Sequence, residues 1–336
     1  MINKEKRLSS LFKSYTGCTP ERMERIYEHS SDRKIFRLFS KGITYIGIYN
    51  NNLPENIAFV NFCKSFYKNG FPVPQIYSVS KDNKYYLEED LGNNTLFSII
   101  SGRNISSLKK MKFYKLVIKN LIKFQLNGCE IIDFAYCFQT KVFNEKLILT
   151  DYLKFKKYFL NNFLSINDIY LLNKLKSILL SLVTISDNNF FMYRDFQPRN
   201  IMVRDNKLFF IDFQTGRKGP LEYDLASFLY SGSISITEKG IIYLIDYYLK
   251  IINKKNPVKK DLFISNFYYF VLLRLIQVLG SYSYVYMKKK DETILNKIPK
   301  ALENLKNVLK ILKNSDLINL YELIASKYES KYLFIP

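Results

Sequence analysis

The sequence predicts an α+β fold of two lobes, a small sheet-rich N-lobe followed by a larger, mainly helical C-lobe. In residues 1–92, short apolar strands surround a single long apolar helix that follows a proline, whereas long amphipathic helical stretches dominate from residue 93 onward. A chain of 336 residues also exceeds the size that one hydrophobic core usually serves. We therefore expect an N-lobe at 1–92 and a C-lobe at 93–336.

The N-lobe elements follow from hydrophobic periodicity and from the positions of glycine and proline. A first helix is expected at about 4–16, and a second opens after Pro54, keeps its apolar residues on one face and ends at Gly70. Strands are expected near residues 25–28, 34–39, 44–49, 75–79 and 85–88.

In the C-lobe, the helical period predicts helices at 113–126, 167–185, 238–253, 260–285 and 296–328. A hairpin lies between the second and third of these, with apolar strands on either side of the turn Asp205-Asn206-Lys207. The apolar stretch near residue 270 is interrupted by Arg274 and Gln277 before it reaches about 20 residues. We expect it to be a buried helix and not a membrane span.

Composition limits the possible partners and the compartment. The net charge of +21 comes mostly from lysines spread along the chain without a dense block, which argues against a nucleic-acid partner. Four cysteines without a C-x-x-C pair and a single histidine argue against a zinc site. Reduced cysteines and a start without the apolar segment of a secretory signal lead us to expect a cytoplasmic protein.

Two stretches, FMYRDFQPRN at 191–200 and FFIDFQTGRKGPLEYDLASFL at 209–229, carry the candidate chemistry. Asp195 precedes Asn200 by five residues, and Asp212 opens a D-F-Q after the next strand. This order is typical of kinases, in which the first Asp takes a hydroxyl proton and the Asn and second Asp hold Mg²⁺ on ATP. Loop aspartates are often only turn formers, but here both follow strand ends that a hairpin brings together. We therefore predict a protein-kinase-like fold that uses ATP and Mg²⁺.

The order of motifs resembles the aminoglycoside phosphotransferase and choline kinase superfamily, and within it the bacterial kinases that phosphorylate N-acetylmuramate and N-acetylglucosamine at C1. The matching segments, which extend from about residue 30 to 305, are SSDRKIFRL, YLEEDLG, DFQPRNIMV, IDFQ with GPLEYDLASFL, and LLRLIQVLGSYSY before a proline.

The resemblance implies a role for each matching residue. Asp195 would be the catalytic base, and Asn200 and Asp212 the metal ligands. Residues 88–91 would form the hinge whose main chain pairs with adenine, so that Glu88 and Asp90 belong to the nucleotide site. Asp224 would brace the catalytic loop, although an Asp there also suits a helix N-cap.

The sequence departs from the family pattern at three places. Tyr193 replaces the usual His, whose place an aromatic ring can fill. The turn at 29–33 lacks glycines, so Ser31 and Arg33 are expected to contact the nucleotide. The strand at 45–50 has no Lys to face the phosphates.

Another cation must then supply the missing charge, and Arg33, Lys34 and Arg37 are the candidates. Glu55 is the natural ion-pair partner, although the residue types favour a simpler first-turn role for it at a helix N-terminus.

The leading hypothesis is phosphorylation of a small hydroxylated metabolite, most simply an amino sugar at its anomeric hydroxyl. Arg199 or Arg217 would offset charge on the transferred group, unless each lies at the surface. The alternatives are a regulatory nucleotide-binding pseudokinase and a kinase for an amino alcohol or aminoglycoside. The sequence leaves the oligomeric state open.

Overall fold

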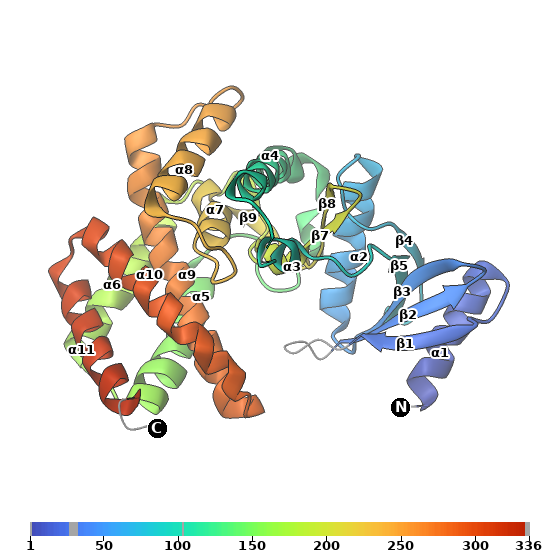
Figure 1. The fold of residues 1–336 in the computed structure, drawn as a ribbon, viewed down its shortest axis with the longest axis horizontal. Coiled ribbons are helices and arrows are strands. Elements are labelled where there is room, and N and C mark those ends of the chain that lie inside the picture. The colour runs from blue at the N-terminus through green and yellow to red at the C-terminus, as the bar shows by residue number, and fades with distance from the viewer. Residues whose placement is uncertain (1, 27–32, 103, 333–336) are drawn as a thin grey trace. The chain divides into compact units, whose positions relative to one another are not determined.

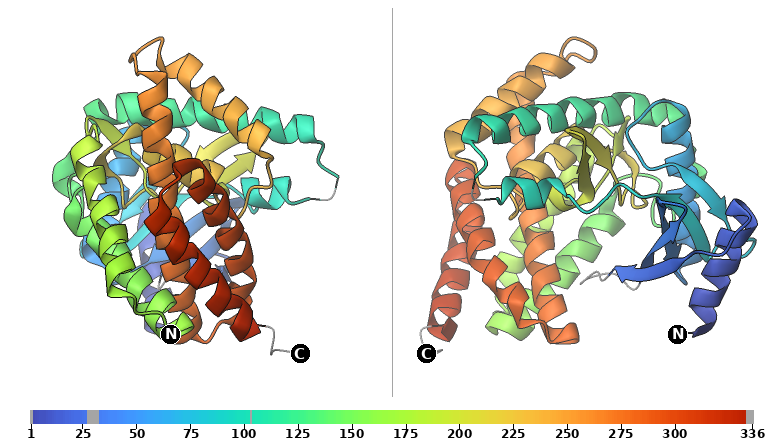
Figure 2. Two further views of the ribbon diagram at one scale, coloured as in Figure 1. Left: turned by 90° about the vertical axis from the view of Figure 1, so that its left-hand side faces the viewer. Right: turned by 45° about the vertical axis from the view of Figure 1, so that its right-hand side comes forward.

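The protein is represented by a computed structural model that describes residues 2–26, 33–102 and 104–332 (Figures 1 and 2). The chain divides into two compact units. The first combines Met1–Lys141 with Tyr193–Arg217, and the second combines Val142–Met192 with Lys218–Pro336. This division places the catalytic hairpin with the N-terminal sheet, whereas the expected lobe boundary near residue 92 remains a prediction.

The first unit contains a five-stranded antiparallel sheet with the order β1-β2-β3-β5-β4. Its strands are β1 (Arg22–Ile26), β2 (Lys34–Ser40), β3 (Ile43–Tyr49), β4 (Ile76–Val79) and β5 (Tyr85–Glu89). Helix α1 (Ile2–Thr16) packs on this sheet through Leu8 and Phe12, which share a buried cluster with Leu38 and Leu87. The helix and the strands agree with the ranges expected from the sequence to within a few residues.

Helix α2 (Leu53–Lys68) lies within two residues of the predicted bounds, although it begins just before Pro54 and not after it. The side chain of Asn52 accepts from the Glu55 amide, and the proline in the first turn needs no hydrogen-bond partner for its nitrogen. Past the helix end, Gly70 adopts φ +69°, a conformation that glycine tolerates best. The buried face of α2 includes Phe59, which stacks on Phe213 directly after Asp212.

The remainder of the first unit carries the hairpin of β7 (Ile201–Arg204) and β8 (Lys207–Phe210). Both turn residues, Asp205 and Asn206, have positive φ, the geometry that matches the twist of a two-residue hairpin. The other elements of this unit are α3 (Leu96–Ile100), α4 (Ser107–Ile131), and the 3₁₀ helices η1 (Phe134–Tyr136) and η3 (Pro198–Asn200). The predicted hairpin is therefore present, and η3 leads directly into it.

The second unit is mainly helical, and α9 (Lys260–Lys289) is its central helix, packed against several others. The remaining helices are α5 (Glu145–Lys154), the π-helix η2 (Phe155–Phe163), α6 (Ile169–Ile185), α7 (Leu221–Leu229), α8 (Glu238–Ile252), the 3₁₀ helix η4 (Glu292–Lys297), α10 (Ile298–Leu312) and α11 (Ser315–Tyr332). Two short strands, β6 (Phe190–Met192) and β9 (Arg217–Gly219), pair beside them.

Helix α9 is long and apolar enough to span a membrane by length and composition, with a mean hydropathy of 1.7 over its apolar window. However, 67% of that window is buried inside the protein, as in the core helix of a soluble protein.

The expected single helix at 296–328 is wrong, because the chain forms α10 and α11 there. Lys313 takes the left-handed conformation with φ 51° and ends α10. The side chain of Asn314 then accepts from the Leu317 amide and caps α11. An unbroken apolar period hid this boundary, since the left-handed residue is a lysine and not the usual glycine.

Candidate active site

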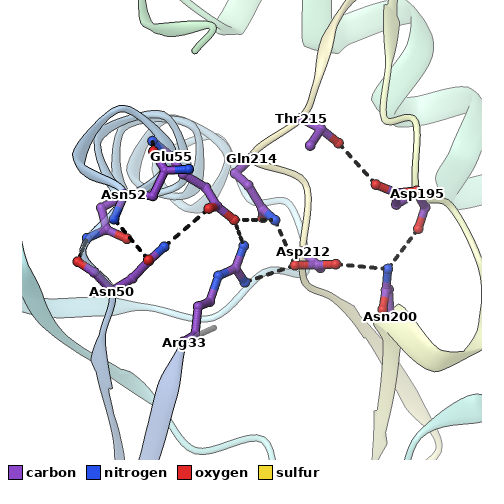
Figure 3. Close-up of polar contacts among 10 residues, drawn as sticks. Arg33, Asn50, Asn52, Glu55, Asp195, Asn200, Asp212, Gln214 and Thr215 are labelled. Carbon is purple, nitrogen blue, oxygen red and sulfur yellow. Dashed lines mark hydrogen bonds and ion pairs between the residues drawn. The ribbon is translucent and has the colours of Figure 1, made fainter. Parts of the chain in front are cut away.

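Asp195, Asn200 and Asp212 lie in two loops at the same end of the β7–β8 hairpin, and a backbone hydrogen bond joins these loops. Asp195 and Asn200 precede β7, and Asp212 follows β8. The Ile211 amide donates to the Asn200 carbonyl at 3.1 Å, which ties the two loops together. The structure thus brings Asp195, Asn200 and Asp212 to one place, as the spacing predicted (Figure 3).

Asn200 links the two aspartates directly. Its Nδ2 donates to the Asp195 carbonyl at 2.9 Å and to Asp212 Oδ2 at 3.3 Å. The hydroxyl of Thr215 donates to Asp195 Oδ2 at 3.4 Å (Figure 3). The candidate base therefore has its backbone held by one neighbour and its carboxylate contacted by another.

The backbone is strained at two points of this site. Arg194 has φ 78° and Asp212 has φ 68°, in the left-handed region that non-glycine residues avoid. Such residues cost on the order of 1–3 kcal/mol and persist where surrounding contacts hold them. The Asp212 carboxylate is held by Arg33 at 2.9 Å and by Gln214 Nε2 at 2.8 Å.

Arg33 is the cation of the site. Its guanidinium pairs with Asp212 and with Glu55, and its side chain is only 13% exposed. Burial acts to lower the pKa of Arg33, but the nearby charges, including the carboxylates of Asp212 and Glu55, outweigh burial and raise the pKa above its usual value. The guanidinium therefore stays charged. Of the three candidate cations for the missing strand Lys, Arg33 is the one that meets both carboxylates.

Glu55 takes the ion-pair role that the residue types had favoured less. Besides Arg33, it accepts from Asn50 Nδ2 at 3.2 Å and from Gln214 Nε2 at 3.3 Å. It also lies in the first turn of α2, so both expected roles are present. Figure 3 shows this network around the Arg33 guanidinium.

Two arginines hold residues 89 and 90 of the segment that the sequence predicts to be the hinge. Arg37 forms a two-point ion pair with Asp90, Nε to Oδ2 at 2.6 Å and NH2 to Oδ1 at 3.0 Å. Burial opposes ionisation of Asp90, but the Arg37 hydrogen bonds and the Gly92 amide outweigh it and lower the pKa of that carboxyl. Arg204 donates to Glu89 Oε1 at 2.7 Å and to the Asp90 carbonyl at 3.2 Å.

The remaining residues predicted for the nucleotide site are Glu88, Ser31 and Asp90. Glu88 is buried in β5, opposite Ile46 of β3. Ser31 lies outside the residues that the structure describes. Asp90 is present at the hinge, but its side chain is committed to Arg37.

Three further expectations can be compared with the structure. Asp224 is fully buried inside the first turn of α7, whose N-cap is Pro220, so the N-cap reading is wrong. Arg199 lies at the surface with its guanidinium 3.7 Å from the centre of the Phe97 ring, whereas Arg217 is 1% exposed. Tyr193 is buried and packs edge-on against neighbouring aromatic rings, as expected for an aromatic in place of His.

Sequence reasoning missed the amide and hydroxyl side chains that support the charged groups. Gln214 and Thr215 follow Asp212 within the D-F-Q-T run, and their proximity in sequence was the available signal. Asn50 and Asn52 gave no comparable signal, because asparagine is common throughout this chain. Gln139, which contacts Arg194 and Arg217, lies in a segment without any motif.

The residues present fit a magnesium ion held mainly by substrate phosphates and water. Among the described residues, no group of three or more His, Cys, Asp or Glu side chains is arranged to hold a metal ion alone. The Asp212 carboxylate and the Asn200 amide lie side by side and provide the hard oxygen donors that Mg²⁺ prefers. One or two such protein ligands suffice when a nucleotide supplies the others.

A five-stranded antiparallel sheet joined to a hairpin that carries a paired carboxylate and amide is the arrangement of a kinase-like fold. Residues 27–255 match the family model described as the phosphotransferase enzyme family, which covers more than half of the chain. The chain therefore belongs to this family and is a phosphotransferase.

Individual relatives agree with that class. The chain is 29% identical over 138 residues to the N-acetylmuramate/N-acetylglucosamine kinase of Neisseria meningitidis, a match that covers 40% of this chain and 41% of that protein. Among solved structures, the choline kinase of Streptococcus pneumoniae is similar with a TM-score of 0.60 and 13% identity, over 91% of this chain and 99% of that one. An amicoumacin kinase, solved with AMP-PNP and Ca²⁺, has a TM-score of 0.62 at 11% identity, over 90% and 91%.

Proposed function

We propose that this protein transfers the terminal phosphoryl group of ATP, with Mg²⁺, to the anomeric hydroxyl of an amino sugar. The observation that carries the proposal is the continuous polar network from Asp195 through Asn200 and Asp212 to Arg33. It combines a candidate base, two oxygen ligands and a cation. Phosphoryl transfer depends on such positioning and on charge neutralisation.

Each side chain takes a distinct role in the proposed reaction. Asp195 orients the acceptor hydroxyl and takes its proton as the sugar oxygen bonds to the γ-phosphorus. The bond from that phosphorus to the bridging oxygen breaks, and this oxygen leaves with ADP. Thr215 fixes one carboxylate oxygen of Asp195. Asp212 and Asn200 would hold Mg²⁺, which neutralises phosphate charge when bound. Arg33 supplies the positive charge that the strand lacks, and Glu55 keeps its guanidinium in place.

The nucleotide would pair with the main chain at 88–91, where Arg204 holds the Asp90 carbonyl and Arg37 holds the Asp90 side chain. Ser31 belongs to the same proposed nucleotide site. With ATP as the phosphoryl donor and four free cysteines, a cytoplasmic location fits the proposal.

An amino sugar is favoured as acceptor because the match to the N-acetylmuramate/N-acetylglucosamine kinase is a match of sequence. The similarity to choline and ethanolamine kinases, at 13% and 15% identity, is a similarity of fold. An amino alcohol is therefore the second candidate acceptor, and aminoglycosides are the third.

The test is a transfer assay with Mg-ATP against N-acetylglucosamine, N-acetylmuramate, choline, ethanolamine and an aminoglycoside, with products identified by ³¹P NMR. An anomeric sugar phosphate from the native protein, lost in Asp195→Asn but retained in Asp205→Asn, is the expected result. Asp205 is a matched control because it lies in the hairpin turn.

Two results would overturn parts of the proposal. Phosphorylation of choline, ethanolamine or the aminoglycoside without any sugar would replace the acceptor class. Binding of Mg-ATP without transfer to any of the five acceptors would support the pseudokinase alternative.

A further inference from the structure

A chain of hydrogen bonds runs from the exposed residue Gln139 to the Asp195 carboxylate. Gln139 Oε1 accepts from Arg217 NH2 at 2.8 Å, and Arg217 donates in turn to the Thr215 carbonyl. The Thr215 hydroxyl then donates to Asp195 Oδ2 at 3.4 Å. All four residues belong to the first compact unit.

Arg217 fixes the backbone at Thr215. Its Nε and NH2 donate to the Thr215 carbonyl at 3.0 and 2.8 Å, and its NH1 donates to the Thr140 hydroxyl. The side chain is 1% exposed, and burying a charged group costs free energy unless its N–H groups form hydrogen bonds. The planar guanidinium therefore acts as a rigid clamp, which a lysine could not reproduce.

The Thr215 contact with Asp195 is sensitive to that clamp. At 3.4 Å it is longer than the usual O–H···O distance of about 2.5–3.0 Å, so a small shift of residue 215 breaks it. A hydroxyl that donates to one carboxylate oxygen favours one orientation of that carboxylate. The orientation of Asp195 is thus set by where Arg217 holds Thr215.

Gln139 also reaches the other side of the base. Arg194, immediately before Asp195, donates through NH1 to the same Gln139 Oε1 at 2.6 Å. Arg194 has the left-handed φ of 78°, a conformation that surrounding contacts must hold. The Gln139 side-chain oxygen therefore links Arg194 to Arg217.

We propose that Gln139 and Arg217 are positioning residues for Asp195, acting through Arg194 on one side and Thr215 on the other. In this proposal both residues act through their neighbours and not on the substrate itself. The proposal deepens the proposed function and rests on the role of Asp195 as base, so its test must be able to fail separately.

The kinetic test compares Gln139→Leu and Thr215→Val with conservative variants, using Mg-ATP and N-acetylglucosamine. Because each substitution removes one hydrogen-bonding group from the chain, kcat should fall roughly tenfold while KM for ATP stays within about twofold. Gln139→Glu, whose carboxylate still accepts from both arginines, and Thr215→Ser should each keep a kcat close to that of the native protein. Thr16→Val is the matched control, since that hydroxyl bonds to the Phe12 carbonyl at the end of α1.

A double variant separates positioning from general destabilisation. Because Gln139 acts through Thr215 in part, Gln139→Leu should lower kcat less in the Thr215→Val protein than in the native one. Equal effects in both backgrounds, or no rescue by Gln139→Glu and Thr215→Ser, would overturn the proposal.

Crystal structures of Gln139→Leu and Gln139→Glu provide a readout that does not depend on the acceptor. In Gln139→Leu the Thr215 hydroxyl should leave Asp195 Oδ2, whereas in Gln139→Glu it should stay. An unchanged Thr215–Asp195 contact in Gln139→Leu would refute the positioning role even if the transfer assay succeeds. Full activity of Asp195→Asn would instead refute the proposed function.

Discussion

Arg33, immediately before β2, donates a hydrogen bond of 2.9 Å to Oδ1 of Asp212, although 179 positions separate the two residues. The same guanidinium pairs with Glu55 on α2. Strand β3, ITYIGIY, has no lysine. A cation can therefore reach both carboxylates from the neighbouring strand, so the absence of a β3 lysine does not by itself indicate a pseudokinase.

Replacing Arg33 tests whether it takes over the phosphate contact. Arg33→Ala should lower kcat/KM for ATP by about a hundredfold or more, because a charge contact worth roughly 3 kcal/mol is lost. Arg33→Lys should recover part of it. Steady-state kinetics with varied Mg-ATP measure the effect, and Arg22→Ala, at an exposed arginine of the same sheet, is the control. Unchanged kcat/KM in Arg33→Ala would mean that another cation contacts the phosphates.

Asp212→Asn tests the metal site. The substitution keeps the shape of the side chain but removes the charge that attracts Mg²⁺. We expect ADP to bind the native protein more tightly with Mg²⁺ than without it. The ratio of these two affinities should be at least tenfold smaller in the variant. Isothermal titration calorimetry with and without Mg²⁺ measures both affinities, and Asp205→Asn is the control for a lost surface charge. If the variant keeps the full Mg²⁺ effect, the ion is held elsewhere.

The sequence predicted elements and charged site residues better than it predicted their supporting contacts. Local patterns were enough for α2, where a proline marks the first turn and a glycine follows the last one. The spacing of Asp195 and Asn200 also located the hairpin site. The Arg33–Asp212 contact could not be read from local sequence, because it depends on how the residue before β2 and the loop after β8 come together in space.

Gln139 illustrates the same limit. Its neighbours in sequence carry no motif, and its importance comes from two arginines more than 50 positions away. Polar residues that act through such contacts leave no periodic signal, whereas apolar faces do.

Glu222 should make stability depend on pH. Burial, with a further contribution from the charge of Asp187, raises its pKa to about 7, although its own amide and Asn266 act the other way. With an unfolded pKa of about 4.3, folding favours the protonated form. The contribution of Glu222 to the free energy of unfolding is thus fully present below about pH 4. It is lost as the pH rises to about 7, and the loss is on the order of 3 kcal/mol.

Glu222→Gln removes this titration, because the amide is neutral at every pH. The variant should match the native protein near pH 4.5 and exceed it in stability at pH 8. Urea unfolding at several pH values measures the difference, with Glu145→Gln, at an exposed first-turn glutamate of α5, as the control. A difference that stays constant from pH 4.5 to 8 would show that the Glu222 pKa is not raised by folding.

Gly280 allows α9 to approach the start of η2 closely. A Cβ atom at this position would lie 2.7 Å from the Phe155 nitrogen and 2.8 Å from its Cα, and backbone atoms cannot move aside as a side-chain end can. Alanine gains about 1 kcal/mol over glycine inside a helix, yet overpacking of this kind typically costs 1–3 kcal/mol. Because both contacts are to backbone, we expect the clash to outweigh the helix gain and Gly280→Ala to lower the thermal midpoint.

Gly232→Ala is the matched control for this prediction. A Cβ there would lie no closer than 3.7 Å to the Tyr282 hydroxyl, an ordinary contact, and the same residue type is changed in the same compact unit. Its thermal midpoint should stay within a degree or two of the native value. If Gly280→Ala is as stable as Gly232→Ala, then α9 and η2 can separate without loss, and the close packing at Phe155 does not hold them together.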